Sequence, residues 1–220
     1  MTGKHAASGQ PPGWFRLDNA AKIYPALNRA RNASVFRMSM RLTETVDPSR
    51  LQQALVRVLP RFPCFRVRMR KGLFWFYFEH NPAEPVALPE TGVLMAPIKP
   101  RETRGFQFRV LYHERRITVE FFHALTDGTG AMVFLKTLVA EYLRLGGDDI
   151  PSTHGVLDPD EPPNPEEMED GYNRYTNFRV VRRPRESKAW HVPAPVESQI
   201  PPLVVTGIVS LAEILKLARN

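Results

Sequence analysis

The sequence predicts an α/β fold: a two-layer sandwich in which helices cover one face of a mixed, largely antiparallel sheet. Residues 35–46 and 106–122 alternate between apolar and polar side chains, as half-buried strands do. Residues 48–59 and 130–145 instead carry apolar side chains at a helical spacing. The predicted order is strand, helix, two hairpins, helix, strand and helix, which is typical of a sheet packed against helices.

The first strand and helix have clear local signals. Residues 1–13 form a polar leader that we expect to be disordered, and residues 14–33 have no clean period, which indicates a loop with a short helical turn at most. After the strand, Asp47 and Pro48 predict a helix start, because aspartate accepts hydrogen bonds from free amides and proline loses none at the first position. Prolines at positions 60 and 63 end this helix.

Two hairpins follow. The first has its turn at Lys71 and Gly72, and a proline-rich connection over residues 81–100 leads to the second. The second turns at residues 113–116, and its return strand leads to His123, which a period of two places on the face of Phe121. The helix after it, over residues 130–145, ends at a pair of glycines.

The composition indicates a globular chain of 220 residues, 43% of them hydrophobic. The longest apolar run, residues 73–78, is far too short for a membrane span, and the start of the chain lacks a signal sequence, so we expect a cytoplasmic protein. A single cysteine excludes an intramolecular disulfide. The net charge of +7 raises nucleic acid as a partner, but no nucleic-acid-binding motif accompanies it, so that partner is disfavoured.

The acidic charge is concentrated in one segment. Residues 146–170 hold nine acids and five prolines and no lysine or arginine, which predicts a mobile or weakly packed loop. A basic stretch follows, up to residue 198. Residues 199–220 then read as a strand and a helix that begins at Ser210.

The stretch FFHALTDGTG contains the strongest candidate for chemistry. A neutral imidazole at His123 can take a proton from a hydroxyl, amine or thiol as that group attacks a carbonyl. Asp127 can cap the next helix or pair with an arginine, and Gly128 leaves space beside the imidazole. The structural alternative is a histidine that merely ends a strand. No histidine or carboxylate pair has a metal-ligand spacing, and no serine or cysteine has a nucleophile-elbow setting.

VEFFHALTDGTG resembles the HxxxDG motif of the chloramphenicol acetyltransferase-like superfamily. VDPSRLQQALVRVLPRFPCFRVRMRKG is similar to the superfamily's first helix and following strand. The similarity runs from about Trp14 to Leu145 and is closest to bacterial alcohol acetyltransferases. It implies the N-terminal half of a fold that condensation domains share.

The resemblance implies an acyltransferase that moves an acyl group from a thioester, such as acyl-CoA, to an alcohol or amine. His123 would be the general base, Asp127 a structural carboxylate and Arg66 its partner, although a solvated strand arginine is the other interpretation of Arg66. The thioester is a co-substrate, and neither a bound cofactor nor a metal is expected.

Two departures from the superfamily pattern bear on function. Phe122 stands where condensation domains have a further histidine, which favours the alcohol acyltransferase branches. A DFGWG-like motif is also missing, so we expect residues 14–145 to be an N-terminal subdomain, 146–198 a loop and crossover, and 199–220 the start of a second subdomain. A missing C-terminal half or another subunit is then the expected partner. The alternative is a non-catalytic binding or scaffold module with the same fold.

Overall fold

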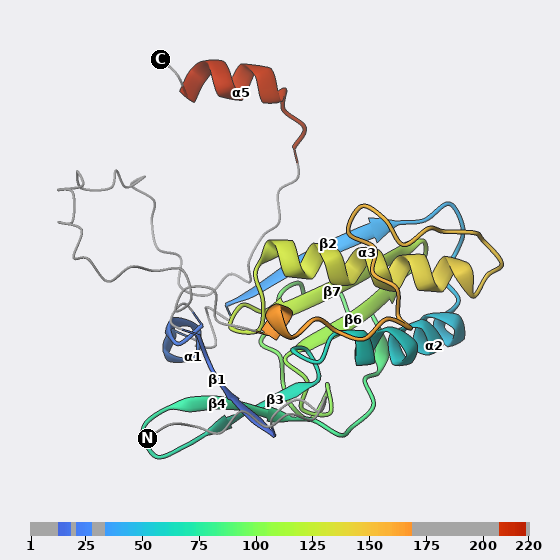
Figure 1. Ribbon diagram of the computed structural model, residues 1–220. Helices are drawn as coiled ribbons and strands as arrows, with labels where there is room; N and C mark the ends of the chain where they lie inside the picture. The colour runs from blue at the N-terminus through green and yellow to red at the C-terminus, as the bar shows by residue number, and fades with distance from the viewer. Residues whose placement is uncertain (1–12, 19–20, 28–33, 169–206, 219–220) are drawn as a thin grey trace. The chain divides into compact units, whose positions relative to one another are not determined.

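The computed structural model describes residues 13–18, 21–27, 34–168 and 207–218. The chain divides into two compact units, Met1–Asn177 and Phe178–Asn220. The described part of the first unit contains two sheets and the helices α1, α2 and α3 (Figure 1). Among the described helices, none combines the length and hydropathy needed to cross a bilayer.

The larger sheet has four strands and is mixed, as predicted. Its order is β2 (Val35–Arg41), β7 (Arg116–Phe122), β6 (Phe108–His113) and β5 (Ala87–Pro89). The β6–β7 hairpin and the β2–β7 pair are antiparallel, whereas β5 runs parallel to β6. The predicted strand over residues 35–46 is shorter than expected and ends at Arg41.

Two helices cover one face of this sheet, α2 (Pro48–Val58) and α3 (Gly128–Arg144) (Figure 1). The predicted helix start is confirmed, since the Asp47 carboxylate accepts hydrogen bonds from the amides of Ser49 and Arg50 at 2.8 and 3.2 Å. A short 3-10 turn, η1 (Leu59–Arg61), extends α2. The core between helices and sheet is a cluster of fully buried side chains that includes Leu51, Leu55, Phe108, Val119, Phe121, Phe134 and Leu138.

The first hairpin belongs to a separate sheet, which the sequence did not indicate. Its strands β3 (Val67–Lys71) and β4 (Phe76–His80) pair antiparallel, and β1 (Trp14–Arg16) pairs with β4 on the other side. An isolated bridge between Arg68 and Phe106 connects the two sheets. Beneath the smaller sheet, Val67 and Phe78 form a second apolar cluster with Phe122 and Ala124, which flank His123. The end of β7 therefore lies where the two sheets meet.

Residues 146–170 were predicted to be a mobile or weakly packed loop, and none of the described side chains of this acidic segment is buried. Up to Met168 it lies along α2 and α3 as a strap, ending in the 3-10 turn η2 (Pro165–Met168). Leu157 packs against the main core, and its amide donates to the Thr137 hydroxyl at 3.0 Å. Arg61 holds the far end through two hydrogen bonds to Glu167, at 2.7 and 2.9 Å. Two of its acids, Asp160 and Glu167, are thus bound by Arg57 of α2 and Arg61 of η1.

The second unit is described over residues 207–218. It contains α5 (Leu211–Ala218), which agrees with the predicted helix, and none of the described side chains of α5 is buried. The predicted strand over residues 203–210 is absent from its described part, residues 207–210. The leader up to residue 12, the last two residues of the acidic segment and the basic stretch over residues 171–198 lie outside the described residues.

Candidate functional site

His123 directly follows the last residue of β7. Its backbone amide donates to the Ser34 carbonyl at 2.8 Å, which extends the β2–β7 ladder by one bond. The next turn begins there, because the Leu125 amide donates back to the Phe122 carbonyl at 2.8 Å. The imidazole is thus fixed at a strand end, and the side chain is half-buried.

Two aromatic rings hold the imidazole. Tyr24 of α1 (Ile23–Leu27) stacks on it with a centroid distance of 4.5 Å and an interplanar angle of 7°. Phe36 of β2 lies at 4.8 Å with a tilt of 53°, and the same Phe36 ring contacts Phe121. Neither imidazole nitrogen of His123 has a hydrogen-bond partner within the described ranges. Ring contacts orient the imidazole, and its nitrogens remain available to a ligand.

Asp127 caps α3. Its carboxylate accepts a hydrogen bond from the Gly130 amide at 2.9 Å, and its backbone φ of −92° and ψ of −176° are those of an extended N-cap residue. This is one of the two roles that the sequence left open, and it is sufficient to fix where the helix begins. The four-residue spacing from His123 places the strand end and the helix start on the same short turn.

The glycines of this turn differ in how closely they are packed. A methyl group on Gly128, the first residue of α3, would meet the Met38 side chain at 3.5 Å, an ordinary contact distance. On Gly130 it would clash with the Thr126 hydroxyl, so Thr126 would have to move. The expected space beside the imidazole at Gly128 stays a prediction, and the closest approach in this turn is at Gly130, which the motif comparison did not single out.

Arg66 does not pair with Asp127 in this structure. The Asn81 backbone amide donates to the Arg66 carbonyl at 2.9 Å. The Arg66 guanidinium lies close enough to His80 to influence the pKa of its imidazole. Burial, followed by the charges of Arg66 and Arg68, lowers the pKa of His80. The Arg66 Nε is buried and has no hydrogen-bond partner among the described residues. The structure therefore assigns Asp127 to the helix cap and leaves Arg66 at the start of β3.

Other nucleophile and metal candidates are weak. Burial raises the pKa of the Cys64 thiol to about 12, which keeps it protonated and unreactive at neutral pH. Within the described ranges, no group of three or more histidine, cysteine or carboxylate side chains could hold a metal ion.

Sequence reasoning missed the two rings that hold His123. The alternation of β2 could have indicated Phe36, because it lies on the same face as the core residues Met38 and Met40. For Tyr24 there was no such signal, since the segment before β2 has no period. Its position next to His123 follows from the tertiary structure alone.

No protein-family model matches the sequence, and no curated protein matches it either. Solved structures do match. A mutant starter condensation domain of the rhizomide synthetase RzmA, in complex with C8-CoA, has a TM-score of 0.50 at 14% sequence identity, over 67% of this chain and 38% of that one. The X-domain in complex with OxyB from teicoplanin biosynthesis has a TM-score of 0.51 at 18% identity, over 70% of this chain and 38% of the other.

The chain has a condensation-domain-like fold. This confirms the predicted α/β fold class. The chain spans about two fifths of the length of these structures, with 38% covered in each. At sequence identities of 14% and 18%, the similarity to these structures shows a shared fold and nothing further.

Proposed function

We propose that this protein is an acyltransferase that moves an acyl group from a thioester, such as acyl-CoA, to an alcohol or amine. His123 is the general base. The observation that carries the proposal is the placement of a ring-held imidazole at the end of β7, on a turn that Asp127 closes by capping α3. Two features support it: the condensation-domain-like fold, and the C8-CoA bound by one protein of that fold.

The proposed step needs one base and no metal. The imidazole removes the proton of the acceptor hydroxyl or amine as its oxygen or nitrogen attacks the thioester carbonyl carbon. The carbon–sulfur bond then breaks, and the proton passes to the departing thiolate, so the products are an ester or amide and a free thiol. Because Tyr24 and Phe36 fix the ring without hydrogen bonds to its nitrogens, the proton can be taken at either nitrogen.

The structures that share the fold are more than twice as long as the part that matches. We therefore propose that the described residues supply the base, and that a further lobe or subunit completes the substrate channel. The alcohol acetyltransferase branch and a cytoplasmic site of action belong to this proposal, on the sequence resemblance alone.

A non-catalytic binding module is the second candidate. Two observations favour it: the imidazole face is covered by the Tyr24 ring, as in an ordinary packed aromatic cluster, and one protein of this fold, the X-domain, is found in complex with OxyB. In that case His123 would contribute packing and no proton transfer.

Acceptor-dependent thiol release by the wild-type protein separates the two candidates, and a variant that keeps the ring then tests the role of His123. His123→Phe retains a planar ring between Tyr24 and Phe36 but has no base, whereas His123→Ala removes both. On the complete protein, with octanoyl-CoA and a set of alcohols and amines, we expect both variants to lower acceptor-dependent thiol release by about a hundredfold or more.

The matched control is His113→Gln, which changes an exposed histidine in the β6–β7 turn and should retain the wild-type rate. Circular dichroism verifies folding. If His123→Phe transferred acyl groups as fast as the wild type, His123 would be a packing residue and the base would have to be sought elsewhere.

A further inference from the structure

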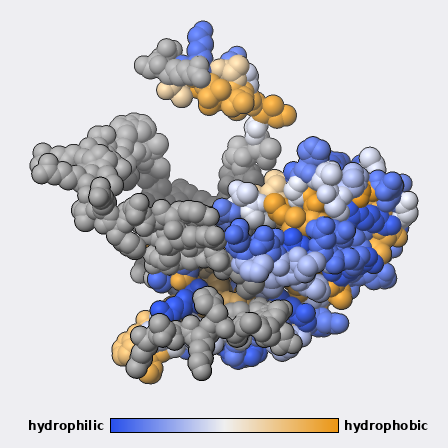
Figure 2. All heavy atoms as spheres, viewed as in Figure 1, coloured by the Kyte–Doolittle hydropathy of each residue, from blue (hydrophilic) through white to orange (hydrophobic). Residues whose placement is uncertain are grey.

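The β3–β4 hairpin ends in an apolar tip, residues 73–75. Leu73 and Phe74 are each 90% exposed and Trp75 is 60% exposed. The turn is closed by a hydrogen bond from the Gly72 amide to the Trp75 carbonyl at 2.7 Å, so a fixed backbone presents the three side chains. Figure 2 shows hydrophobic side chains gathered at this end of the hairpin. Adjacent exposed apolar side chains of this size commonly mark a binding surface.

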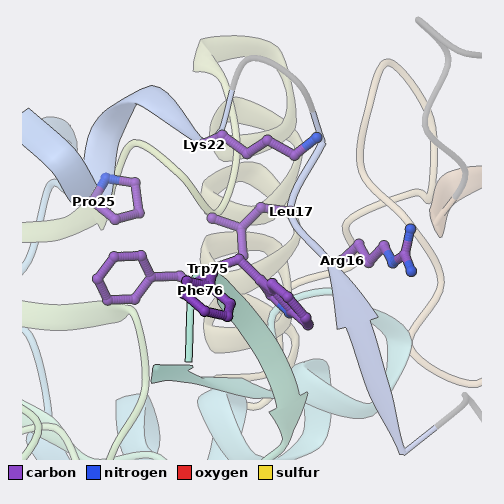
Figure 3. Close-up of a pocket in the computed structure, with 7 residues that line it drawn as sticks. Arg16, Leu17, Lys22, Pro25, Trp75 and Phe76 are labelled. Atoms are coloured by element: carbon purple, nitrogen blue, oxygen red, sulfur yellow. The ribbon is translucent and has the colours of Figure 1, made fainter. Parts of the chain in front are cut away.

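The apolar surface continues from the tip toward β1 and α1. A pocket of about 530 Å³ lies beside the hairpin, and its lining includes Leu17, Pro25 and Phe76 together with the tip residues Phe74 and Trp75 (Figure 3). Phe76 is the first residue of β4 and directly follows the tip. A partner that covered this region would therefore remove more apolar surface from water than the tip alone provides.

Positive charge predominates behind this tip. The strands β1, β3 and β4 together contain four arginine or lysine residues and one carboxylate, Glu79. Arg68 and Arg70 both bond that carboxylate, at 2.8 and 2.7 Å, so one acid serves two guanidinium groups. The other two cations, Arg16 and Lys71, are exposed. The smaller sheet therefore has an excess of positive charge.

Three of these cations lie close behind the tip. Arg16 and Arg70 are both opposite Tyr77 of the central strand, so they flank it on one face of the sheet. Lys71 directly precedes the turn. At about 3.3 Å per residue, all three are within roughly 7 Å of the turn along their strands. Interfacial protein segments bury their apolar side about 5–10 Å into a bilayer, so these cations would then lie at the level of the lipid headgroups.

We propose that the tip and the cations behind it form a docking surface for a bilayer that contains anionic lipids. Leu73, Phe74 and Trp75 enter the boundary between headgroups and acyl chains, where their apolar surface leaves water. An indole suits this depth, because its ring is apolar and its N–H can donate to a lipid carbonyl or to water. Arg16 and Lys71 are attracted by the negative surface of the leaflet.

Charge complementarity favours a bilayer over a second copy of this chain. Two copies that met tip to tip would bring their positive charges together, and like charges repel. A leaflet with anionic lipids has the opposite sign over the whole contact area. The docking surface is independent of the acyl transfer proposed above, because it requires neither the imidazole nor a thioester.

Trp75 provides a direct reporter of lipid contact. The chain has three tryptophans, so the substitutions Trp14→Phe and Trp190→Phe leave Trp75 as the single indole. We expect vesicles of phosphatidylcholine and phosphatidylglycerol, with bromine near the headgroup end of their acyl chains, to quench Trp75 emission in a saturable way. Vesicles of phosphatidylcholine alone should bind at least about tenfold more weakly, because they lack the electrostatic attraction.

Two pairs of substitutions test the two parts of the surface, with vesicle co-sedimentation as the measurement. Leu73→Ser with Phe74→Ser should weaken binding to the anionic vesicles by about tenfold or more, because apolar burial is lost. Arg16→Gln with Lys71→Gln should also weaken it by about tenfold or more, and should leave the weak binding to phosphatidylcholine within about twofold. All four side chains are exposed, so the variants should fold as the wild type does.

Each pair has a matched control. Val93→Ser with Met132→Ser removes two exposed apolar side chains outside the hairpin. Arg41→Gln with Arg115→Gln removes two exposed positive charges at the far end of the β2–β7 pair. We expect both controls to retain the wild-type affinity for anionic vesicles, and circular dichroism verifies folding of every variant.

The proposal is overturned if the anionic vesicles show no saturable binding, if both kinds of vesicle bind equally, or if either pair of test substitutions leaves the affinity unchanged. Light scattering without lipid detects the alternative occupant. A wild-type dimer that dissociates in the Leu73→Ser/Phe74→Ser variant, in a protein that binds no vesicles, would assign the tip to a contact between two copies of the chain.

Discussion

Glu120 is the most completely buried charge in the described part of the chain, with no exposed surface. It lies on β7 three residues before His123, on the sheet face opposite α2 and α3. Its carboxylate accepts from Arg109 Nε at 2.7 Å, Arg37 at 3.1 Å and the Met95 amide at 3.1 Å. Arg37 also bonds Glu90 at 2.6 Å, so the charges form a connected network. The network fixes the strand that presents His123.

We predict that Glu120→Gln lowers the free energy of unfolding by about 3 kcal/mol, because an amide of the same shape leaves the buried Arg109 guanidinium without its counterion and removes one of the two carboxylates that Arg37 binds. Urea denaturation measures this. Glu79→Gln is the matched control, since Glu79 also bonds two arginines, Arg68 and Arg70, but on an accessible surface. The control should change stability little. A Glu120→Gln variant as stable as the wild type would mean that the network is dispensable.

At the scale of single elements, local signals predicted the parts whose partners are close in sequence. Asp47 and Pro48 predicted the start of α2. The alternation of β6 and β7 predicted a hairpin that places His123 at the end of its second strand. The strand β5 was not predicted, because it is three residues long and is defined by parallel pairing with β6 rather than by any pattern of its own.

Long-range partners account for the other errors. The resemblance implied that Arg66 pairs with Asp127, but the Asp127 carboxylate instead accepts from the Gly130 amide, three residues away. The acidic composition of residues 146–170 correctly indicated little core burial. It did not indicate that Arg57 and Arg61, some hundred residues earlier, would bind Asp160 and Glu167. The composition of a segment predicts how little of it is buried, but the residues that bind it lie elsewhere in the sequence.

The strap over α2 and α3 should respond to pH. Hydrogen bonds from Arg61 lower the pKa of Glu167, despite an opposing effect of burial. A carboxyl whose folded pKa is depressed stabilises the bound strap fully above its unfolded pKa of about 4.3, and the contribution is lost as the pH falls through the lower folded value. We predict that hydrogen-exchange protection of residues 161–168 persists at neutral pH and decreases as the pH falls below the ordinary glutamate pKa of about 4.3.

Glu167→Gln should produce the same loss of protection at neutral pH, measured by exchange mass spectrometry and corrected for intrinsic rates. Asp160→Asn is the comparison, because the Arg57–Asp160 pair is exposed on both sides and should contribute little. Equal protection in the wild type and Glu167→Gln would show that Leu157 and the backbone hold the strap without the ion pair.

At the scale of the whole molecule, both buried apolar clusters that the structure describes belong to the first unit. Both apolar clusters consist of residues between Phe15 and Leu157. In the second unit, α5 has apolar side chains that remain in solvent, with Leu211 71% and Leu217 73% exposed. Burial of apolar surface is the main favourable term in folding, so we expect the first unit, which holds both described apolar clusters, to fold without the second.

We therefore predict that a chain ending at Asn177 folds and unfolds cooperatively, with a midpoint of thermal unfolding within a few degrees of that of the 220-residue chain. Circular dichroism melts of the two chains measure this. Light scattering should also show less self-association after truncation, because the exposed apolar face of α5 is gone. A truncated chain that melts far lower or lacks a cooperative transition would show that residues 178–220 belong to the same folding unit, and the boundary at Asn177 would have to be abandoned.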